Sequence, residues 1–124
     1  MFDAQILIAG SSSYSIYSPW FSRGGDNLRA SAQILVGDAN ISVHVFTKNS
    51  EDVGNGMDVN SNVELSLTTP GSTVVTAEWG PNTTSGSAGG LEELVRYKYT
   101  VTGTAGTSAL FRMLSPVWFD TINA

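Results

Sequence analysis

Alternation of apolar and polar residues over residues 94–102 is the feature that most constrains the fold of this chain. The odd positions are apolar: Val95, Tyr97, Tyr99 and Val101. After Leu94, the even positions are polar: Arg96, Lys98, Thr100 and Thr102. A helix would scatter both sets around its circumference, whereas a strand separates them because successive side chains point to opposite faces. We therefore predict a β-strand that buries its apolar face.

The same period of two recurs in several other segments. It is clearest at residues 41–47 and 63–67, while residues 73–79 form a β-branched run that ends at Trp79. Further strands are predicted at these segments: 5–9, 14–17, 31–36 and 109–114. Turns rich in Gly, Asn, Asp, Ser and Pro separate the strands. Only residues 91–94 have a helix-like pattern, and they are too few to form a stable helix.

About eight short strands at this spacing predict an all-β fold, an antiparallel β-sandwich of jelly-roll type. The 124 residues are enough for one domain, which we place at residues 1–124, and too few for two. A domain of this length has a core large enough to fold without a metal or a disulfide. Trp79 continues the inward face of its strand, so we expect it in that core.

Composition excludes several classes of function. The chain has no cysteine, which rules out disulfides, thiolate zinc sites and cysteine nucleophiles. Its formal net charge is −5, so we expect no nucleic acid as a partner, since attraction of Lys and Arg to phosphate dominates that affinity. We also expect no membrane partner, because no apolar stretch is long enough to cross a bilayer. The first residues lack the charged start of a secretory signal, which favours a chain made in the cytoplasm.

The residues needed for catalysis do not assemble in the sequence. His44 is the only histidine, and it lies within a predicted strand on the face that carries Ser42 and Phe46. We interpret it as a half-exposed strand residue rather than a general base for a serine nucleophile. Glu92 and Glu93 are adjacent, so in an extended chain they point to opposite faces instead of flanking a substrate. We therefore predict that the chain is not an enzyme.

The sequence also does not match the residue patterns of known metal-binding or phosphate-binding loops. Residues 58–62 match the first half of a calcium-binding loop, but position six is Val63 instead of Gly and position twelve is Thr69 instead of Glu. An irregular calcium site in the loop at residues 49–62 stays open as an alternative. The Gly-rich segments lack the lysine of a phosphate-binding loop, and Asn-Gly at 55–56 is interpreted as a tight turn. We predict no catalytic residue, no metal and no cofactor.

Aromatic residues beside prolines are the remaining candidates for a binding surface. Residues 18–21 read Ser-Pro-Trp-Phe, and residues 115–119 read Ser-Pro-Val-Trp-Phe. The first and last strands of a jelly roll commonly pair, which would bring these segments together; the alternative is two independent strand ends. Partly exposed aromatic residues favour interfaces as well as cores. We predict a partner interface of five residues: Tyr17, Trp20, Phe21, Trp118 and Phe119.

The chain resembles the small capsid cement or decoration proteins of tailed bacteriophages. The likeness lies in its size, its short N-terminal strand, the Arg-Gly-Gly-Asp turn at residues 23–26 and the closing segment at residues 111–120. The resemblance implies a virion structural protein that is made in the host cytoplasm. It would bind the major capsid protein on the outer capsid surface and stabilise the capsid. It also implies a homo-oligomer, with a trimer as the form typical of these proteins.

The alternative function is a carbohydrate-binding, lectin-like jelly-roll module. Jelly rolls host sugar sites that use aromatic rings and Asn- or Asp-rich loops. Exposed Trp20 or Trp118 beside the loop at residues 49–62 would suit such a site. Under either function we expect association, because a small sandwich gains from covering its strand edges and exposed aromatic residues.

Overall fold

The computed structural model describes residues 4–8, 14–59, 63–68, 70–71, 73–80, 90–103 and 108–120. Every regular element within these ranges is a β-strand, which confirms the predicted all-β class. Among the described residues, no helix has the length and apolar character needed to cross a membrane.

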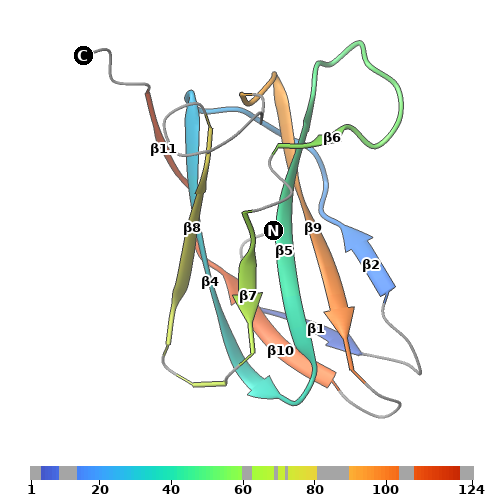
Figure 1. Cartoon of the computed structure of the whole chain (residues 1–124), viewed down its shortest axis with the longest axis vertical. Helices are drawn as coiled ribbons and strands as arrows, with labels where there is room; N and C mark the ends of the chain where they lie inside the picture. Colours follow the sequence, from blue (N-terminus) through green and yellow to red (C-terminus); the bar gives the residue numbers. More distant parts are fainter. Residues whose placement is uncertain are drawn as a thin grey trace.

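The described residues form eleven strand segments: β1 (Ala4–Ile8), β2 (Tyr14–Tyr17), β3 (Phe21–Ser22), β4 (Asn27–Gly37), β5 (Asn40–Lys48), β6 (Met57–Asp58), β7 (Leu65–Leu67), β8 (Val75–Trp79), β9 (Leu94–Thr102), β10 (Ser108–Met113) and β11 (Val117–Phe119). They form two antiparallel sheets, here called the β4 sheet and the β9 sheet. Figure 1 shows β4 and β8 side by side in one sheet and β5 and β9 side by side in the other.

The eleven segments differ from the expected eight or so because three strands are interrupted. β10 and β11 both pair with the side of β4 that faces away from β8. In the same way β2 and β3 share one side of β9, and β6 and β7 share one side of β5. In each of these three pairs, the two segments lie end to end beside the same neighbouring strand. The eleven segments therefore occupy eight strand positions, four across each sheet.

Pairing along the chain is nested. β1 pairs with β10, β2 with β9, β4 with β8, and β5 with β6 and β7. The chain is thus folded back on itself like one long hairpin of paired strands, and successive strand pairs alternate between the two sheets. Residues far apart in the sequence therefore meet at every level of the sandwich.

The core fills the space between the sheets. The apolar face predicted for residues 94–102 is confirmed, since all four of its side chains are buried, and so are the inward residues of β5. Trp79, which was expected in the core, is 0% exposed. The β4 sheet contributes Ala30, Ala32 and Ile34 among others, and small alanines there leave room for the large rings of the other sheet.

The segment with the helix-like pattern forms no helix. Leu94 begins β9, and Leu91 is buried against the core. Four residues cannot nucleate a helix, so the ladder of β9 and the apolar surface beneath Leu91 decide the conformation. The predicted strand at residues 31–36 also begins earlier, at Asn27. Residues 80–90, a stretch rich in Ser, Thr and Gly that the sequence predicts as a long loop, lie largely outside the described residues.

Prolines stand at two of the strand interruptions. Pro19 separates β2 from β3, and Pro116 separates β10 from β11. A proline cannot donate a hydrogen bond to a ladder, so a strand breaks or bulges there. The two segments do lie close together, because the rings of Phe21 and Trp118 are 6.2 Å apart. They meet through these side chains and not as a strand pair, since β3 pairs with β9 and β11 with β4.

Candidate functional site

The outer face of the β9 sheet carries a cluster of rings and cations. Tyr17 lies opposite Lys98 in the strand register, and Phe46 lies opposite Arg96, so these side chains share a face. We call this surface the cation–aromatic face and define it by six residues: Tyr17, Trp20, Phe46, Lys48, Arg96 and Lys98. Antiparallel sheets usually turn a simply polar face to water, so large rings here are unusual.

Arg96 is the centre of this face. Its guanidinium carbon lies 3.9 Å from the ring centre of Tyr17 and 4.3 Å from that of Trp20. Its Nη2 also donates to Asn55, at 2.8 Å to the side-chain Oδ1 and at 3.2 Å to the carbonyl oxygen. Arg96 is only 9% exposed, and this burial lowers its pKa, although an arginine stays protonated at any ordinary pH.

The two lysines of the face lie over the same group of rings. Lys98 Nζ is 5.5 Å from the ring centre of Phe46, and Lys48 Nζ is 5.0 Å from that of Trp20. The rings of Tyr17 and Phe46 meet edge to face at 5.7 Å. Within the described part of the chain no carboxylate lies within ion-pair distance of these lysines or of Arg96. The cations therefore contact ring faces, and Lys48 and Arg96 also donate to loop oxygens, to the Asp52 carbonyl and to Asn55 respectively.

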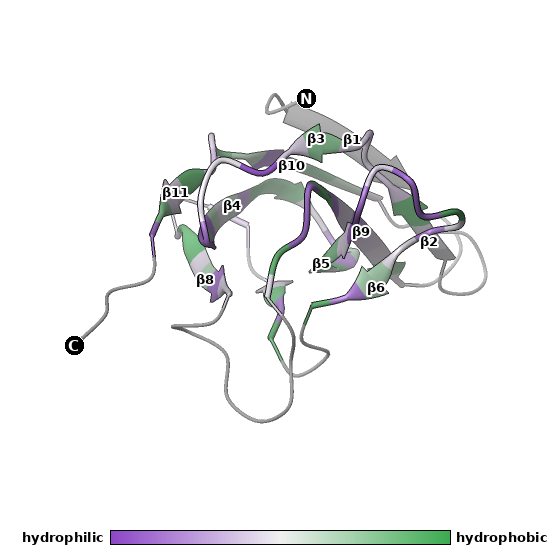
Figure 2. Cartoon of the chain, turned by 90° about the horizontal axis from the view of Figure 1, so that it is seen from above, coloured by the Kyte–Doolittle hydropathy of each residue, from purple (hydrophilic) through white to green (hydrophobic). Residues whose placement is uncertain are grey.

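The loop between β5 and β6 borders the cation–aromatic face. In the view from above, β6 and β2 lie on the same side of the molecule, away from β8 and β11 (Figure 2). Figure 2 shows this loop as largely hydrophilic, and its apolar residue Val53 is 95% exposed. Gly56 lies directly against the ring of Trp20, so the loop and the face form one continuous surface.

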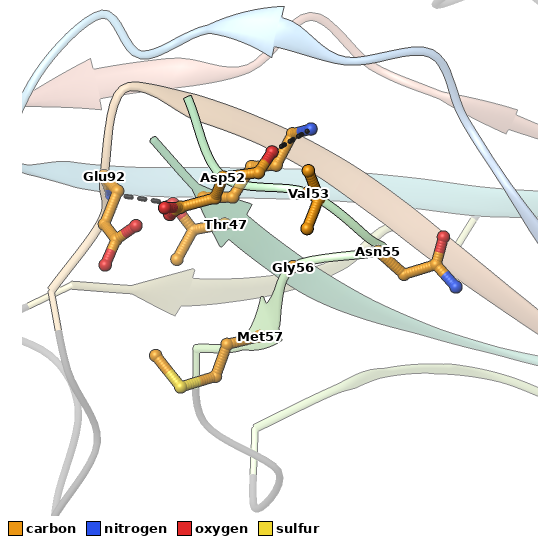
Figure 3. Close-up of a pocket in the computed structure, with 8 residues that line it drawn as sticks. Thr47, Asp52, Val53, Asn55, Gly56, Met57 and Glu92 are labelled. Atoms are coloured by element: carbon orange, nitrogen blue, oxygen red, sulfur yellow. Dashed lines mark hydrogen bonds between the residues drawn. The ribbon is translucent and has the colours of Figure 1, made fainter. Parts of the chain in front are cut away.

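A groove of about 410 Å³ lies under this loop. Its lining comprises Thr47, Lys48, Asp52, Val53, Asn55, Gly56, Met57 and Glu92. Figure 3 shows Thr47 and Glu92 at one end, Asn55 at the other and Gly56 between them. The Thr47 hydroxyl accepts from Glu92 N at 2.7 Å and donates to the Leu94 carbonyl at 2.9 Å, which fixes that end. The groove offers polar groups of both charges with exposed Met57 at its rim.

His44 is held between two carboxylates on the same sheet. Its Nε2 bonds to Glu64 Oε2 at 3.0 Å, and its Nδ1 lies 3.2 Å from Asp58 Oδ2, an ion-pair distance without hydrogen-bond alignment. The half-exposed strand position predicted for His44 is confirmed. Both ring nitrogens face carboxylates, so the histidine ties β5 to β6 and to the residue before β7. In the part of the chain that is described, no three metal-binding side chains are grouped to hold an ion.

The five residues predicted as a partner interface divide between two places. Tyr17 and Trp20 belong to the cation–aromatic face, where Tyr17 is 37% exposed. Phe21 packs between Tyr97, at 5.4 Å, and Trp118. The ring of Trp118 covers Gly24. Arg29 lies 5.4 Å above the ring of Phe119.

Arg96, Lys98, Phe46 and Lys48 were missing from the predicted site. The alternation in residues 94–102 places Arg96 and Lys98 on an outward face, and that signal was available in the sequence. The register that sets Phe46 opposite Arg96 depends on pairing between strands about fifty residues apart, which no local pattern reveals. The sequence pattern indicates only a turn at Asn55, and the contact of Asn55 with Arg96 is likewise tertiary.

No protein-family model, curated protein or solved structure matched this chain in the three comparisons made.

Proposed function

We propose that this chain is a non-enzymatic virion structural protein, a capsid cement protein that binds the outer capsid surface and stabilises it. The observation that carries the proposal is the cation–aromatic face, which marks a surface suited to a protein partner. Tyr, Trp, Arg and Met are the residue types enriched at the energetic centres of protein interfaces. Tyr17, Trp20 and Arg96 supply three of these types in one cluster, and Met57 lies at its border.

Rigidity of the face adds support. A side chain that is already held in place loses little conformational entropy on binding, so more of its contact energy appears as affinity. Arg96 is fixed by two rings and by Asn55, and Lys98 lies over two rings. Val53, in the loop that borders the face, is almost fully exposed and offers additional apolar area.

The nested pairing of the strands is the second support. We interpret it as the winding of a jelly roll, in which two Greek keys make a double sheet. Jelly rolls recur in viral capsid proteins and in lectins. The partner in this proposal is the major capsid protein, the place of action is the capsid surface of the virion, and the chain acts as a homo-oligomer, with a trimer as the first form to test.

Co-sedimentation with capsids assembled from the major capsid protein of the parent virus tests the proposal. We expect stoichiometric binding and a higher temperature of capsid disruption. Lys98→Glu on the cation–aromatic face should weaken binding by about tenfold or more. Arg112→Glu makes the same charge change on an exposed residue of the other sheet and should bind like the parent chain. Absence of the protein from the capsid pellet would refute the cement function.

Carbohydrate binding is the second candidate, and the groove favours it. Asp52, Asn55 and Glu92 line the groove and have the polar groups that bind sugar hydroxyls. However, the ring face of Trp20 is taken by Arg96, and the ring of Trp118 covers Gly24, so neither tryptophan offers a free stacking platform on that side. A glycan array with and without calcium separates the two functions, since a cement protein should bind no glycan specifically.

A further inference from the structure

We infer that Asn55 is a self-modification site at which the side-chain amide is converted to a carboxylate. Asn55-Gly56 is the only Asn-Gly pair in the sequence. It lies on the rim of the groove, where Asn55 is exposed to water (Figure 3). Glycine matters at the second position because it has no side chain to block the approach of its own nitrogen to the preceding residue.

The chemistry needs no oxidant, reductant or cofactor. The backbone nitrogen of Gly56 attacks the side-chain Cγ of Asn55, a new C–N bond forms, and the amide nitrogen leaves as ammonia. Solvent takes the proton of the Gly56 nitrogen and returns one to the leaving group. Water then opens the five-membered cyclic imide at either of its two carbonyl carbons. The net change is asparagine plus water giving aspartate or isoaspartate plus ammonia.

Arg96 is placed to assist the first step as a positioning residue. Its Nη2 donates to Oδ1 of Asn55 at 2.8 Å, and this oxygen gains negative charge as the nitrogen attacks. A charged donor aimed at a developing oxyanion stabilises the transition state, and the effect is greater where water is partly excluded. The rings of Tyr17 and Trp20 hold the guanidinium in place from its faces.

The attacking nitrogen is also unengaged. In the part of the chain that the structure describes, the Gly56 N–H donates no hydrogen bond, so none has to break before the attack. Gly56 has a φ of 78°, in a loop whose other residues from 51 to 55 are all exposed. The reacting groups therefore lie at the surface of the protein, where solvent can exchange protons with them.

The two products have opposite effects on the surface. An aspartate at position 55 places a carboxylate beside the Arg96 guanidinium and gives it the acidic partner that it lacks in the described residues. An isoaspartate lengthens the backbone by one bond and displaces Gly56, which lies against Thr47 and Trp20. The first product tightens the loop onto the cation–aromatic face, and the second separates the loop from it.

The test is to incubate the purified full chain at neutral and mildly alkaline pH and to follow each asparagine by peptide mapping and mass spectrometry. Asn49 is the comparator, because it is exposed in the same loop and is followed by Ser50. We expect a mixture of aspartate and isoaspartate at position 55, forming about tenfold or more faster than at Asn49. Asn55→Gln should stay unmodified, since the longer side chain cannot close the five-membered ring.

The role of Arg96 has its own test. Arg96→Lys and Arg96→Gln should slow the conversion by about tenfold, provided that thermal melting shows both variants folded. A second measurement does not need these variants: the folded chain should convert Asn55 faster than the chain in denaturant. Slower conversion in the folded chain would overturn the assistance by Arg96. An intact amide at Asn55 in the folded chain, under conditions that modify the denatured chain, would overturn the site itself.

Discussion

At the scale of single residues, Arg96 shows how a buried cation is accommodated without a carboxylate. Removing a guanidinium from water is unfavourable unless other groups replace the lost hydration. Here two ring faces and two oxygens of Asn55 replace it. A lysine would keep the charge but not the flat shape that stacks on both rings, so this position distinguishes the two basic residues. The same contacts fix both the outer face and the neighbouring loop.

Two glycines with nearly the same positive φ angle allow a matched prediction. Gly37 has φ of 132° and Gly71 has φ of 131°. A Cβ at Gly37 would overlap the backbone of Ser108 and Ala109, whereas a Cβ at Gly71 would meet no atom within 4 Å. Gly71→Ala should therefore lower the free energy of unfolding by about 1–3 kcal/mol from backbone strain alone.

Gly37→Ala should lower the free energy of unfolding by more than Gly71→Ala does, because the β4–β10 pairing must also shift. Denaturant unfolding of the two variants and the parent chain measures the difference. Equal losses of stability in the two variants would contradict the role of the close β10 backbone.

At the scale of elements, the two Ser-Pro segments show how a sheet tolerates a broken strand. Pro19 and Pro116 end ladders, yet the neighbouring strands continue past them. At the first break Ser18 bridges the gap. Its amide donates to the Tyr97 carbonyl at 2.9 Å, and its hydroxyl accepts from the Tyr97 amide at 2.9 Å. A side chain thus supplies the acceptor that a continuous strand would supply from its backbone.

Ser18→Ala should lower the free energy of unfolding by about 1–3 kcal/mol, because it removes an acceptor from a buried backbone amide. Ser115 is the matched control, since it also precedes a proline but is exposed. Ser115→Ala should change stability by less than about 0.5 kcal/mol. Thermal unfolding of both variants tests this, and a neutral Ser18→Ala would show that the amide finds another partner.

At the scale of the whole molecule, aromatic rings join the two sheets. Tyr99 on β9 meets Phe111 on β10 at 5.4 Å between ring centres, and Phe21 on β3 meets Trp118 on β11. These contacts place the phenols of Tyr97 and Tyr99 in the core, where burial raises the pKa of both; the nearby Tyr99 raises the pKa of Tyr97 further. The packing of the sandwich is therefore coupled to the protonation of two tyrosines.

This coupling predicts loss of stability at alkaline pH. A raised pKa means that the folded chain keeps the phenolic protons at a pH where the unfolded chain releases them. The free energy of unfolding is therefore unaffected by these two tyrosines below the ordinary tyrosine pKa of about 10. It falls as the pH rises above that pKa. Thermal unfolding at a series of pH values, with tyrosinate absorbance recorded in parallel, measures it.

Tyr99→Phe provides the control for the alkaline transition. Tyr99 Oη is buried and has no hydrogen-bond partner among the described residues, so its removal should leave stability at neutral pH undiminished. The decline above about pH 10 should be shallower in this variant because one buried group no longer ionises. An unchanged decline would assign the alkaline transition to other groups.

The fold could be predicted from the sequence to the level of class and strand faces. The alternation at residues 94–102 and 41–47 gave both the strands and their buried sides, and Trp79 proved to be core. The interruptions at Pro19 and Pro116 were visible as prolines, but not as two segments sharing one position. The candidate site was predicted in part, with Tyr17 and Trp20 identified and the cations between them overlooked.

The sequence by itself determined which side of the clearly alternating strands faces the core, because a period of two assigns faces residue by residue. It also indicated where several turns interrupt the strands, because proline and glycine act on the local backbone. Only the tertiary structure decided which outward residues meet. The pairing of β5 with β9 sets Phe46 beside Arg96, and the loop at Asn55 reaches the same guanidinium. Such contacts depend on register between distant strands, and register is set by how the whole core packs rather than by any local pattern.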